Sequence, residues 1–257
     1  MSDPAALINQ AGALLRRSRE AIAFTGAGIS TPSGIPDFRS PGSGLWEHVD
    51  PMEVASLAAF RYHPERFYAW LRPLASTLAA AQPNAAHRAL AEMESAGLLK
   101  MVITQNIDEL HVRAGSRRVL EMHGSLRQAT CGRCRRVEAG PPLLAEFIAT
   151  GNVPRCRECG GVMKPNAILM GEQLLESVLR EARAAAGRCD VMLVAGSSLE
   201  VMPSAALPLE AVSHGARLIM VNIGPTYLDE RADVLIRADV ADILPQIAAA
   251  TRQASHV

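Results

Sequence analysis

The 257-residue sequence has no excess of charge of either sign, no long apolar run and few aromatic side chains. Lys and Arg together number 26, as do Asp and Glu, so the formal net charge is zero. This balance argues against a polybasic nucleic-acid-binding protein, an acidic tail and a charge-anchored membrane protein. Aromatic residues make up only 4%, which disfavours a base-stacking platform for single-stranded nucleic acid. No apolar run approaches the roughly 20 residues of a membrane-spanning helix.

The amino-terminal residues Met1–Gln10 include Asp3 and no basic segment before an apolar run. We therefore expect a helix of a soluble protein here rather than a secretion signal. The five cysteines are an odd number, and four of them form two Cys-x-x-Cys pairs. This usage favours a reduced, metal-binding chain in the cytoplasm over a disulfide scaffold. Hydrophobic residues, at 49%, supply a sizeable core, and the length fits one large domain with an insertion.

Short apolar runs alternate with segments of helical spacing along most of the chain. Buried runs between helices are typical of parallel strands, so the sequence predicts an α/β fold with a Rossmann-like parallel sheet. The expected strands are Ala21–Thr25, Met101–Thr104, Arg118–Met122, Val191–Ala195, Leu218–Asn222 and Val234–Arg237. The expected helices are Ala5–Ser18, Asn84–Ala96, Leu174–Ala186, Ser204–Ser213 and Ile243–Ala250.

Two stretches interrupt this alternation. Ser40–Leu78 contains the helical segments Met52–Phe60 and Pro64–Leu74 with no strand between them, and Gln128–Pro165 is rich in Cys, Arg, Gly and Pro with little apolar periodicity. We expect both to be insertions that together form a smaller domain, from about residues 40–81 (helical) and 128–165 (cysteine-rich). The large domain would take about residues 1–39, 82–127 and 166–257.

A glycine-rich loop, Gly26-Ala27-Gly28, directly follows the first expected strand, where phosphate-binding loops lie. A plain strand-to-helix turn is the alternative, because a lone Gly-x-Gly is weak evidence. The dehydrogenase fingerprint Gly-x-Gly-x-x-Gly would need glycine where the chain has Thr31, and no clear second strand with an acidic tip follows about 20 residues on. A hydride-transferring Rossmann enzyme is therefore disfavoured.

Two Cys-x-x-Cys pairs, separated by 21 residues, indicate a tetrahedral zinc site. Two disulfides or unligated thiols are the alternatives. Four protein sulfurs leave no open position for catalysis, so we expect a structural zinc. Arginines surround the cysteines, and we favour a solvated face over a nucleic-acid contact. The four expected ligands are Cys131, Cys134, Cys156 and Cys159, and the fifth cysteine, Cys189, is expected to be a buried or half-buried thiol.

Polar side chains follow the expected strand Met101–Thr104. Gln105, Asn106 and Asp108 come directly after it, at the strand end where open α/β sheets bind ligands. A helix cap formed by Asn106 or Asp108 is the alternative. Three such residues within four positions are more than a cap requires, so ligand binding is favoured.

Two further strand ends carry candidate residues that the local sequence alone does not assign. His123 follows Arg118–Met122, and a lone histidine there is more often a structural hydrogen-bonding group than a catalyst. Gly196-Ser197-Ser198 follows Val191–Ala195, where small residues allow a cofactor to approach the backbone. A plain turn explains these residues equally well.

The continuation of the glycine loop is far more specific. The segment from Gly26 to Arg39, GAGISTPSGIPDFR, closely resembles the signature of the sirtuins, which are NAD-dependent protein deacylases. The resemblance covers nearly the whole chain, roughly residues 7–247, and recurs in order at Thr104-Gln105-Asn106-Ile107-Asp108, at His123-Gly124, at the two cysteine pairs, at Gly196-Ser197-Ser198 and at Val221-Asn222.

This resemblance implies a role for each matching residue. His123 would be the general base, which suits an imidazole because it titrates near neutral pH. Phe38, Ile107 and Asp108 would bind nicotinamide, whose carboxamide needs both an acceptor and a donor. The residues at the ribose would be Gln105 and Asn106, the second also catalytic. The NAD ribose and phosphate would meet Gly196, Ser197 and Ser198, and the adenosine would meet Asn222, Ile223, Gly224 and Val240. The other NAD-binding residues implied are Gly26, Ala27, Gly28, Thr31, Asp37, Arg39 and His123.

The reaction implied is removal of an acetyl or other short acyl group from lysine of a protein or peptide, with NAD consumed as co-substrate. The products would be nicotinamide, which also inhibits, free lysine and O-acetyl-ADP-ribose. Protein mono-ADP-ribosylation or NAD hydrolysis on the same fold is the first alternative. The second is a non-enzymatic zinc-containing binding module, which the presence of His123, Asn106 and Asp108 disfavours. Neither a membrane nor a nucleic acid is an expected partner.

The chain departs from the family pattern at the loop that closes over the acyl-lysine. Sirtuins usually carry Phe-Gly-Glu there, whereas this chain has Met170-Gly171-Glu172. Sirtuins that remove succinyl or malonyl groups also carry a Tyr-x-x-Arg pair in the helix matching Pro64–Leu74, where this chain has Leu71 and Leu74. The resemblance therefore implies an apolar acyl tunnel, suited to acetyl, propionyl or butyryl groups.

Overall fold

The structure is a computed structural model that describes residues 3–38, 44–45 and 49–252. The chain divides into two compact units, which are described separately. The first comprises Met1–Ser33, Gln82–Met122 and Leu175–Val257, and the second comprises Gly34–Ala81 and His123–Leu174. Among the described residues, no helix combines the length and the apolar character needed to cross a membrane.

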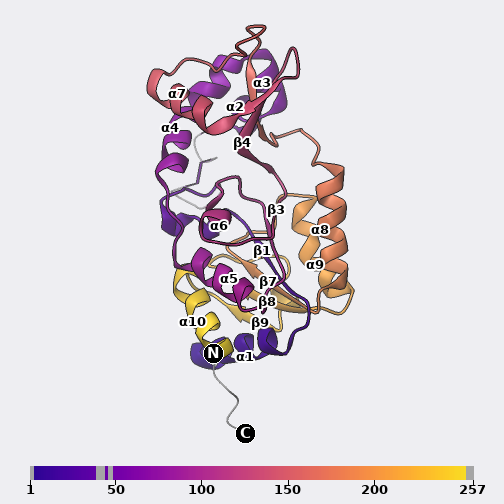
Figure 1. The fold of residues 1–257 in the computed structure, drawn as a ribbon. Coiled ribbons are helices and arrows are strands. Elements are labelled where there is room, and N and C mark those ends of the chain that lie inside the picture. Colours follow the sequence, from indigo (N-terminus) through magenta and orange to yellow (C-terminus); the bar gives the residue numbers. More distant parts are fainter. Residues whose placement is uncertain (1–2, 39–43, 46–48, 253–257) are drawn as a thin grey trace. The chain divides into compact units, whose positions relative to one another are not determined.

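The first unit is built on a six-stranded parallel sheet with the strand order β3-β2-β1-β7-β8-β9 (Figure 1). From the neighbouring strands β1 and β7, the sheet continues through β2 and β3 on one side and through β8 and β9 on the other. The β1–β7 pair is therefore the topological switch point, where α/β sheets bind ligands. The register aligns Thr25, Thr104 and Ala195, so the carboxyl ends of β1, β2 and β7 lie side by side. The strands are β1 (Ala21–Thr25), β2 (Val102–Thr104), β3 (Val119–Glu121), β7 (Val191–Ala195), β8 (Arg217–Val221) and β9 (Val234–Ile236).

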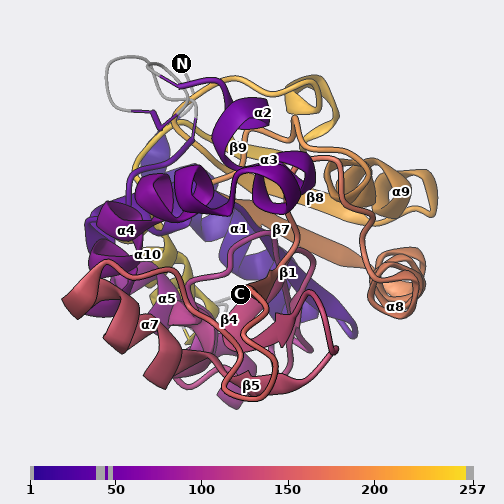
Figure 2. The same ribbon diagram turned by 90° about the horizontal axis from the view of Figure 1, so that it is seen from above.

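Helices cover both faces of this sheet. Figures 1 and 2 show α8 and α9 on the side away from α5 and α10. The helices of this unit are α1 (Pro4–Arg17), α5 (Ala85–Ser95), α6 (Leu110–Arg113), α8 (Glu176–Arg188), α9 (Leu207–Ser213) and α10 (Val240–Arg252). Short 3-10 turns lie at Ala27–Ile29, Thr31–Ser33, Ser204–Ala206 and Asp229–Arg231.

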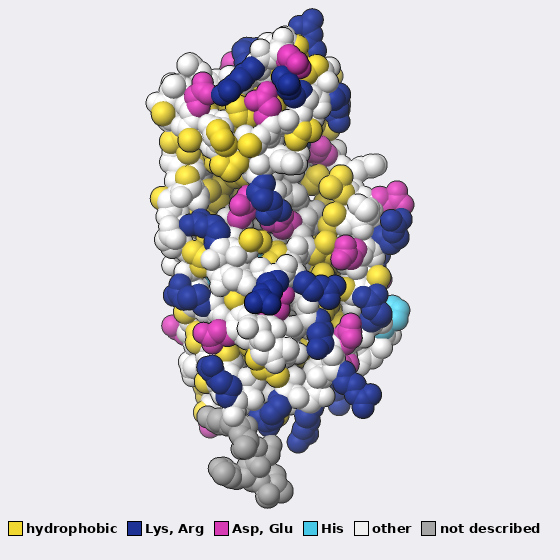
Figure 3. All heavy atoms as spheres, viewed as in Figure 1, with side chains coloured by type: hydrophobic (Ala, Val, Ile, Leu, Met, Phe, Trp, Pro, Cys, Tyr) yellow, Lys and Arg dark blue, Asp and Glu magenta, His cyan; other side chains and the backbone are white. Residues whose placement is uncertain are grey.

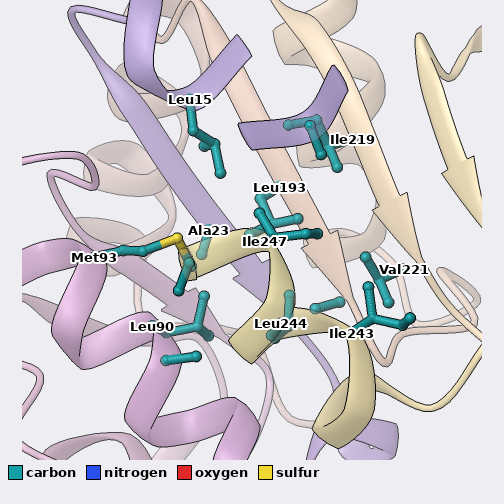
Figure 4. Close-up of a cluster of buried hydrophobic side chains, with 14 of the residues drawn as sticks. Leu15, Ala23, Leu90, Met93, Leu193, Ile219, Val221, Ile243, Leu244 and Ile247 are labelled. Atoms are coloured by element: carbon teal, nitrogen blue, oxygen red, sulfur yellow. The ribbon is translucent and has the colours of Figure 1, made fainter. Parts of the chain in front are cut away.

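The core of the first unit lies where α1, α5 and α10 pack against the sheet (Figure 4). Each of β1 and β7 is buried over its whole length, as expected of strands covered on both faces. In α1, Asp3 caps the helix by accepting a hydrogen bond from the Ala5 amide at 3.1 Å, and Ile8, Ala11 and Leu15 form its buried stripe.

The amino terminus of α5 carries a reciprocal cap. The Asn84 side chain accepts from the amides of Ala86 and His87, and the His87 ring accepts from the Asn84 amide. His87 is fully buried, and this burial lowers its pKa to about 4, so the ring is neutral at pH 7 and able to accept. The Asn84 Nδ2 group also donates to the Ile29 carbonyl at 2.8 Å, which ties α5 to the glycine loop.

The second unit contains a helical part and a three-stranded antiparallel sheet of order β5-β4-β6. Its helices are α2 (Pro51–Val54), α3 (Leu57–Tyr62), α4 (Pro64–Ala80) and α7 (Gly140–Thr150), and its strands are β4 (Gly124–Cys131), β5 (Val137–Ala139) and β6 (Met163–Ala167). An aromatic cluster fills its interior, with edge-to-face ring contacts among Phe60, Phe67, Tyr68 and Phe147.

The six strands expected from the apolar runs are confirmed within one or two residues, and so are the helices α1, α5 and α8. Two differences concern the helical insertion, where Met52–Phe60 is broken into α2 and α3 at Ala55–Ser56, and α4 runs on to Ala80 past Pro73. Gln128–Pro165, despite its weak apolar periodicity, contains buried apolar side chains. Leu143 and Phe147 of α7 are one turn apart and buried, and Ala129, Cys131 and Met163 form a second buried cluster with Leu143.

Charged side chains of both signs are interspersed over the face seen in Figure 3. On that face no single sign of charge dominates, in agreement with the neutral composition.

Candidate functional site

The loops that follow β1 and β7 touch each other at the switch point of the sheet. The Gly28 amide donates to the Gly196 carbonyl at 2.9 Å. A Cβ on Gly28 would lie 2.9 Å from that carbonyl oxygen, and one on Gly196, whose φ is +61°, would lie 2.3 Å from the Ile29 nitrogen. Only glycine permits this approach at both positions. The Thr31 hydroxyl closes the loop by donating to the Gly28 carbonyl at 3.0 Å.

Gln105 links the loop after β2 to the loop after β7. Its side-chain Oε1 accepts from the Ser197 hydroxyl at 3.0 Å, and its Nε2 donates to the Ser204 hydroxyl at 2.9 Å. Ser197 is buried, whereas Ser198 is exposed and Ala27 is half-buried. The structure therefore brings together the predicted residues of three separate loops at one edge of the sheet.

Asn106 and Asp108 are joined through Ser30, a residue of the glycine loop that the sequence analysis did not single out. Asn106 Nδ2 donates to the Ser30 hydroxyl and to the Gly26 carbonyl, both at 3.1 Å. Ser30 in turn donates to Asp108 Oδ2 at 2.6 Å. The hydroxyl fits both roles because it can accept one hydrogen bond while donating another.

Asp108 also serves the helix that follows, because its Oδ1 accepts from the Leu110 amide at 2.9 Å. This hydrogen bond is the backbone contact that the capping interpretation predicts, while ligand binding by Asp108 stays a prediction. Burial raises the pKa of Asp108, while its hydrogen bonds with Ser30, Leu110 and Asn106 lower it. The neighbouring Ile107 is half-buried, so its backbone lies at the edge of the same network.

The loop after β8 is held in shape by its own polar groups. Asn222 Nδ2 donates to the Gly224 carbonyl at 2.8 Å, and Arg237 donates to the same carbonyl and pairs with Asp229. Ile223 is 71% exposed between them, so its side chain is available to a ligand. Val240 instead has its side chain in the core at the start of α10, so only its backbone can meet a ligand.

The remaining predicted NAD-binding residues and His123 belong to the second unit. His123 precedes β4 and is half-buried, and its carbonyl accepts from the Ile168 amide at 2.8 Å. Gly124 follows with φ +69°, and a Cβ there would overlap the Asn166 oxygen at 2.1 Å. Asp37 and Phe38 are half-buried, and Arg39 lies outside the described residues.

The four predicted zinc ligands form one cluster. Their sulfur atoms all lie within 4.8 Å of one another, and the Cys131–Cys159 and Cys134–Cys156 pairs are 3.5 and 3.6 Å apart. Four sulfurs around one zinc at 2.3 Å would be about 3.8 Å apart, whereas a disulfide would bring two of them to about 2 Å. The cluster thus fits a tetrahedral ion, and all five cysteines of the chain are free.

The surroundings of the cluster act in opposite directions on two of its thiols. Amide hydrogen bonds from Cys134 and Arg133 lower the pKa of the Cys131 thiol to about 6, whereas hydrogen bonds with the neighbouring sulfurs and burial raise the pKa of the Cys134 thiol to about 12. Gly161 leaves room for the sulfurs, because a Cβ there would lie 2.9 Å from Cys131 Sγ. Cys189 is buried in the first unit, as expected, and burial raises its pKa to about 12.

The loop carrying Met170 is also part of the second unit. The Met170 amide donates to the Ala55 carbonyl at 3.0 Å, and the Leu57 amide donates to the Met170 carbonyl at 2.9 Å. This segment therefore bridges the strand β6 and the junction between α2 and α3. Lys164, which the sequence analysis did not single out, forms an ion pair with Glu172 of this loop.

Comparison with known proteins gives consistent results. The "NAD-dependent protein deacylase 2" of Archaeoglobus fulgidus is 46% identical over 241 residues, which cover 93% of this chain and 94% of the relative. A solved complex described as Sir2 with a p53 peptide and NAD+ superposes with a TM-score of 0.84 at 39% identity, covering 92% of this chain and 95% of the other. Another, of a Sir2 variant with deacetylated p53 peptide and 3'-O-acetyl-ADP-ribose, has a TM-score of 0.89 at 39% identity, covering 94% and 97%. The sequence profile of the Sir2 family matches residues 26–203, and the chain belongs to that family.

Proposed function

We propose that this protein is an NAD-dependent protein deacetylase, which removes acetyl and other short acyl groups from lysine side chains. NAD is consumed as co-substrate, and the products are nicotinamide, free lysine and O-acetyl-ADP-ribose. The observation that carries the proposal is the Asn106–Ser30–Asp108 network at the switch point of the sheet. The names of the relatives and the ligands of the solved Sir2 complexes support it.

In the first unit, we assign nicotinamide to Asp108 and the Ile107 backbone. A carboxamide offers an NH2 group as donor and an oxygen as acceptor, which a carboxylate and a backbone amide complement. Gln105 and Asn106 are assigned to the ribose, and the Gly26–Gly28 and Gly196–Ser198 loops to the phosphates and the second ribose. The exposed Ile223 and the Asn222–Gly224 backbone are assigned to the adenosine. Val240 would contribute the amide at the start of α10, where the helix dipole favours polar ligands.

In the second unit, we assign His123 as the general base that takes the proton from a ribose hydroxyl. A base of this type lowers the barrier because imidazole exchanges protons near neutral pH. The backbone of His123 is fixed at its carbonyl, which accepts a hydrogen bond from the Ile168 amide. Asp37 and Phe38 are assigned to the cofactor-binding segment. Zinc at the four cysteines would supply folding energy to this unit and no step of the reaction.

The test is incubation of the protein with an acetyl-lysine peptide and NAD, with nicotinamide and O-acetyl-ADP-ribose measured together by mass spectrometry. Equal amounts of the two products are expected. Nicotinamide with free ADP-ribose would instead indicate NAD hydrolysis, and mass added to the peptide would indicate ADP-ribosyl transfer.

His123→Ala is expected to lower kcat by about 10²–10⁴-fold, the range for loss of a general base. ADP-ribose binding, measured by calorimetry, should be retained because the other assigned contacts remain. His63→Ala is a matched control, since His63 is an exposed histidine of the same unit. Deacetylation by the His123→Ala protein at the wild-type rate would refute the assignment.

We also propose a cytoplasmic location. The support is that all five cysteines are free and four are arranged as metal ligands, a state that a reducing compartment maintains. Cell fractionation with antibody detection tests this, and recovery in an oxidising compartment would contradict it.

A further inference from the structure

Lysine is rare in this chain, and one of its two lysines lies in an unusual place. Of the 26 basic residues only Lys100 and Lys164 are lysines. Lys164 is on β6 of the second unit, and only 16% of its side chain is exposed. A long cationic side chain is seldom buried to this extent unless its charge is compensated.

The Lys164 ammonium is fully compensated by three oxygen atoms. It donates to the Ala167 carbonyl at 2.8 Å, to the Pro165 carbonyl at 3.1 Å and to Glu172 Oε2 at 2.9 Å. An ammonium has three N–H donors, so every one of them has an acceptor. The side chain therefore joins the end of β6 to a residue five positions beyond that strand.

Glu172 is held from both sides. Its Oε2 also accepts from the Leu169 amide at 3.0 Å, and its own amide donates to the Leu169 carbonyl at 2.9 Å. These two bonds close a turn in which Gly171 takes φ +76°. The Glu172 side chain is 25% exposed, so its ion pair with Lys164 is largely shielded from water and from salt screening.

The segment closed in this way, Ile168–Glu172, makes two contacts that concern function. At one end the Ile168 amide binds the His123 carbonyl, and in the middle Met170 exchanges hydrogen bonds with Ala55 and Leu57. One short segment therefore touches the proposed base and the helical insertion, and it contains the Met170-Gly171-Glu172 loop.

We propose that Lys164 and Glu172 are positioning residues that hold Ile168–Glu172 in the conformation that binds the acyl-lysine peptide. The inference rests on the proposed function, and it adds to that function the assignment of this segment, which contains the loop that the sirtuin resemblance places over the acyl-lysine, to substrate binding. Without the ion pair, the three acceptors of the ammonium lose their donor, and only the two hydrogen bonds between Leu169 and Glu172 are left to hold the turn. Affinity for peptide then falls in proportion to the fraction of molecules that keep the competent conformation.

The experiment compares binding of two ligands to the zinc-loaded protein. A fluorescent acetyl-lysine peptide is titrated by anisotropy, and ADP-ribose is titrated by calorimetry. For Lys164→Met we expect the peptide Kd to rise about tenfold, corresponding to a fall of the competent fraction to about a tenth. The ADP-ribose Kd should change less than twofold. Lys164→Arg keeps the positive charge and should stay within about threefold of the wild type for both ligands.

Two further variants keep the test independent of stability. Lys164→Met combined with Glu172→Gln leaves no unpaired charge, so its melting temperature should lie above that of Lys164→Met alone while its peptide Kd stays raised. Arg136→Met breaks an exposed ion pair with Glu158 in the same unit and should leave both Kd values unchanged.

An unchanged peptide Kd in folded Lys164→Met and in the double variant would overturn the inference. Parallel weakening of peptide and ADP-ribose, tracking the melting temperature, would also overturn it, because that pattern indicates general destabilisation. Wild-type protein that binds the acetylated peptide no better than the unmodified one would instead refute the proposed function itself.

Discussion

The two carboxylate oxygens of Asp108 accept hydrogen bonds from different partners. One carboxylate oxygen caps the turn after β2 and the other accepts from Ser30. Each carboxylate oxygen has two lone pairs, so acceptor capacity remains for a ligand. The identity of such a residue is predictable from its motif. The link from Asp108 to Asn106 through Ser30 is not predictable from the sequence. Ser30 and Asn106 are more than 70 residues apart and meet only when β1 pairs with β2.

Replacing Asp108 by Asn should weaken both turnover and inhibition by nicotinamide. The change exchanges an acceptor oxygen for an N–H group, and hydrogen bonds to charged groups contribute about 1.5–3 kcal/mol. The nicotinamide inhibition constant should therefore rise about tenfold or more. Steady-state inhibition at several NAD concentrations measures this, and non-competitive inhibition is expected for the wild type. The matched control is Asp242→Asn, at an exposed position of α10. Equal inhibition constants in the Asp108→Asn protein and the wild type would contradict the assignment.

Glu109 shows a feature that the sequence does not reveal. Its φ is +61°, a left-handed conformation that a residue with a Cβ adopts at a cost of about 1–2 kcal/mol. Glycine removes that cost but gains freedom in the unfolded chain, worth about 0.5–1 kcal/mol. Glu109→Gly should therefore raise the free energy of unfolding by about 0.5–1 kcal/mol. Urea unfolding measures the change, and Glu109→Ala, which keeps a Cβ, should give no gain. Destabilisation of the Glu109→Gly protein would show that the Glu109 side chain makes a stronger contribution than the strain.

At the scale of elements, the two sheets differ in how far the sequence predicts them. Val191–Ala195 is recognisable because a strand buried on both faces is an uninterrupted apolar run. In β4, by contrast, exposed Arg127 and Gln128 lie beside buried Ala129, and β6 contains Pro165. Neither strand has a continuous apolar or strictly alternating pattern, so the antiparallel sheet was missed. The cysteine spacing nevertheless located the cluster that these strands support.

Loss of one cysteine ligand should release the zinc and destabilise the sheet β5-β4-β6. Cys131 is fully buried at the end of β4, so a Cys131→Ser protein loses both a ligand and the thiolate that the surrounding amides stabilise. We expect about one zinc per wild-type chain by atomic absorption and much less in the variant, with a lower melting temperature. Cys189→Ser, in the first unit, should retain the metal. A fully active wild-type preparation without zinc would refute the structural role.

At the scale of the whole molecule, the proposed roles are divided between the two units. The loops assigned to NAD come from the parallel sheet of the first unit, and the base, the cysteine cluster and the Met170 loop come from the second. The family motifs predict this assignment of residues to roles. The contacts of individual side chains of the second unit, which our prediction of acyl selectivity uses, could not be predicted from these motifs.

Arg72 is the nearest cation in sequence to Leu71 and Leu74, so its contacts bear on the predicted acyl selectivity. It donates to the Ile148 carbonyl at 2.8 and 3.2 Å and to the Ala149 carbonyl at 3.4 Å, at the carboxyl end of α7. These are the carbonyls that a helix terminus leaves without partners, and a cation there is favoured by the helix dipole. The guanidinium is thus already engaged on α7, while Leu71 is buried among apolar side chains.

A succinyl or malonyl carboxylate should therefore find no cation in the acyl tunnel. Such a group would lose its hydration without gaining a partner, at a cost of several kcal/mol, and each 1.4 kcal/mol is about tenfold. We predict a preference of at least about a hundredfold in kcat/KM for acetyl-lysine over succinyl-lysine on the same peptide. Arg72→Gln should leave this ratio unchanged, since the residue caps α7. A ratio near one in the wild type, or one that rises sharply in Arg72→Gln, would show that Arg72 leaves the helix end to serve the carboxylate.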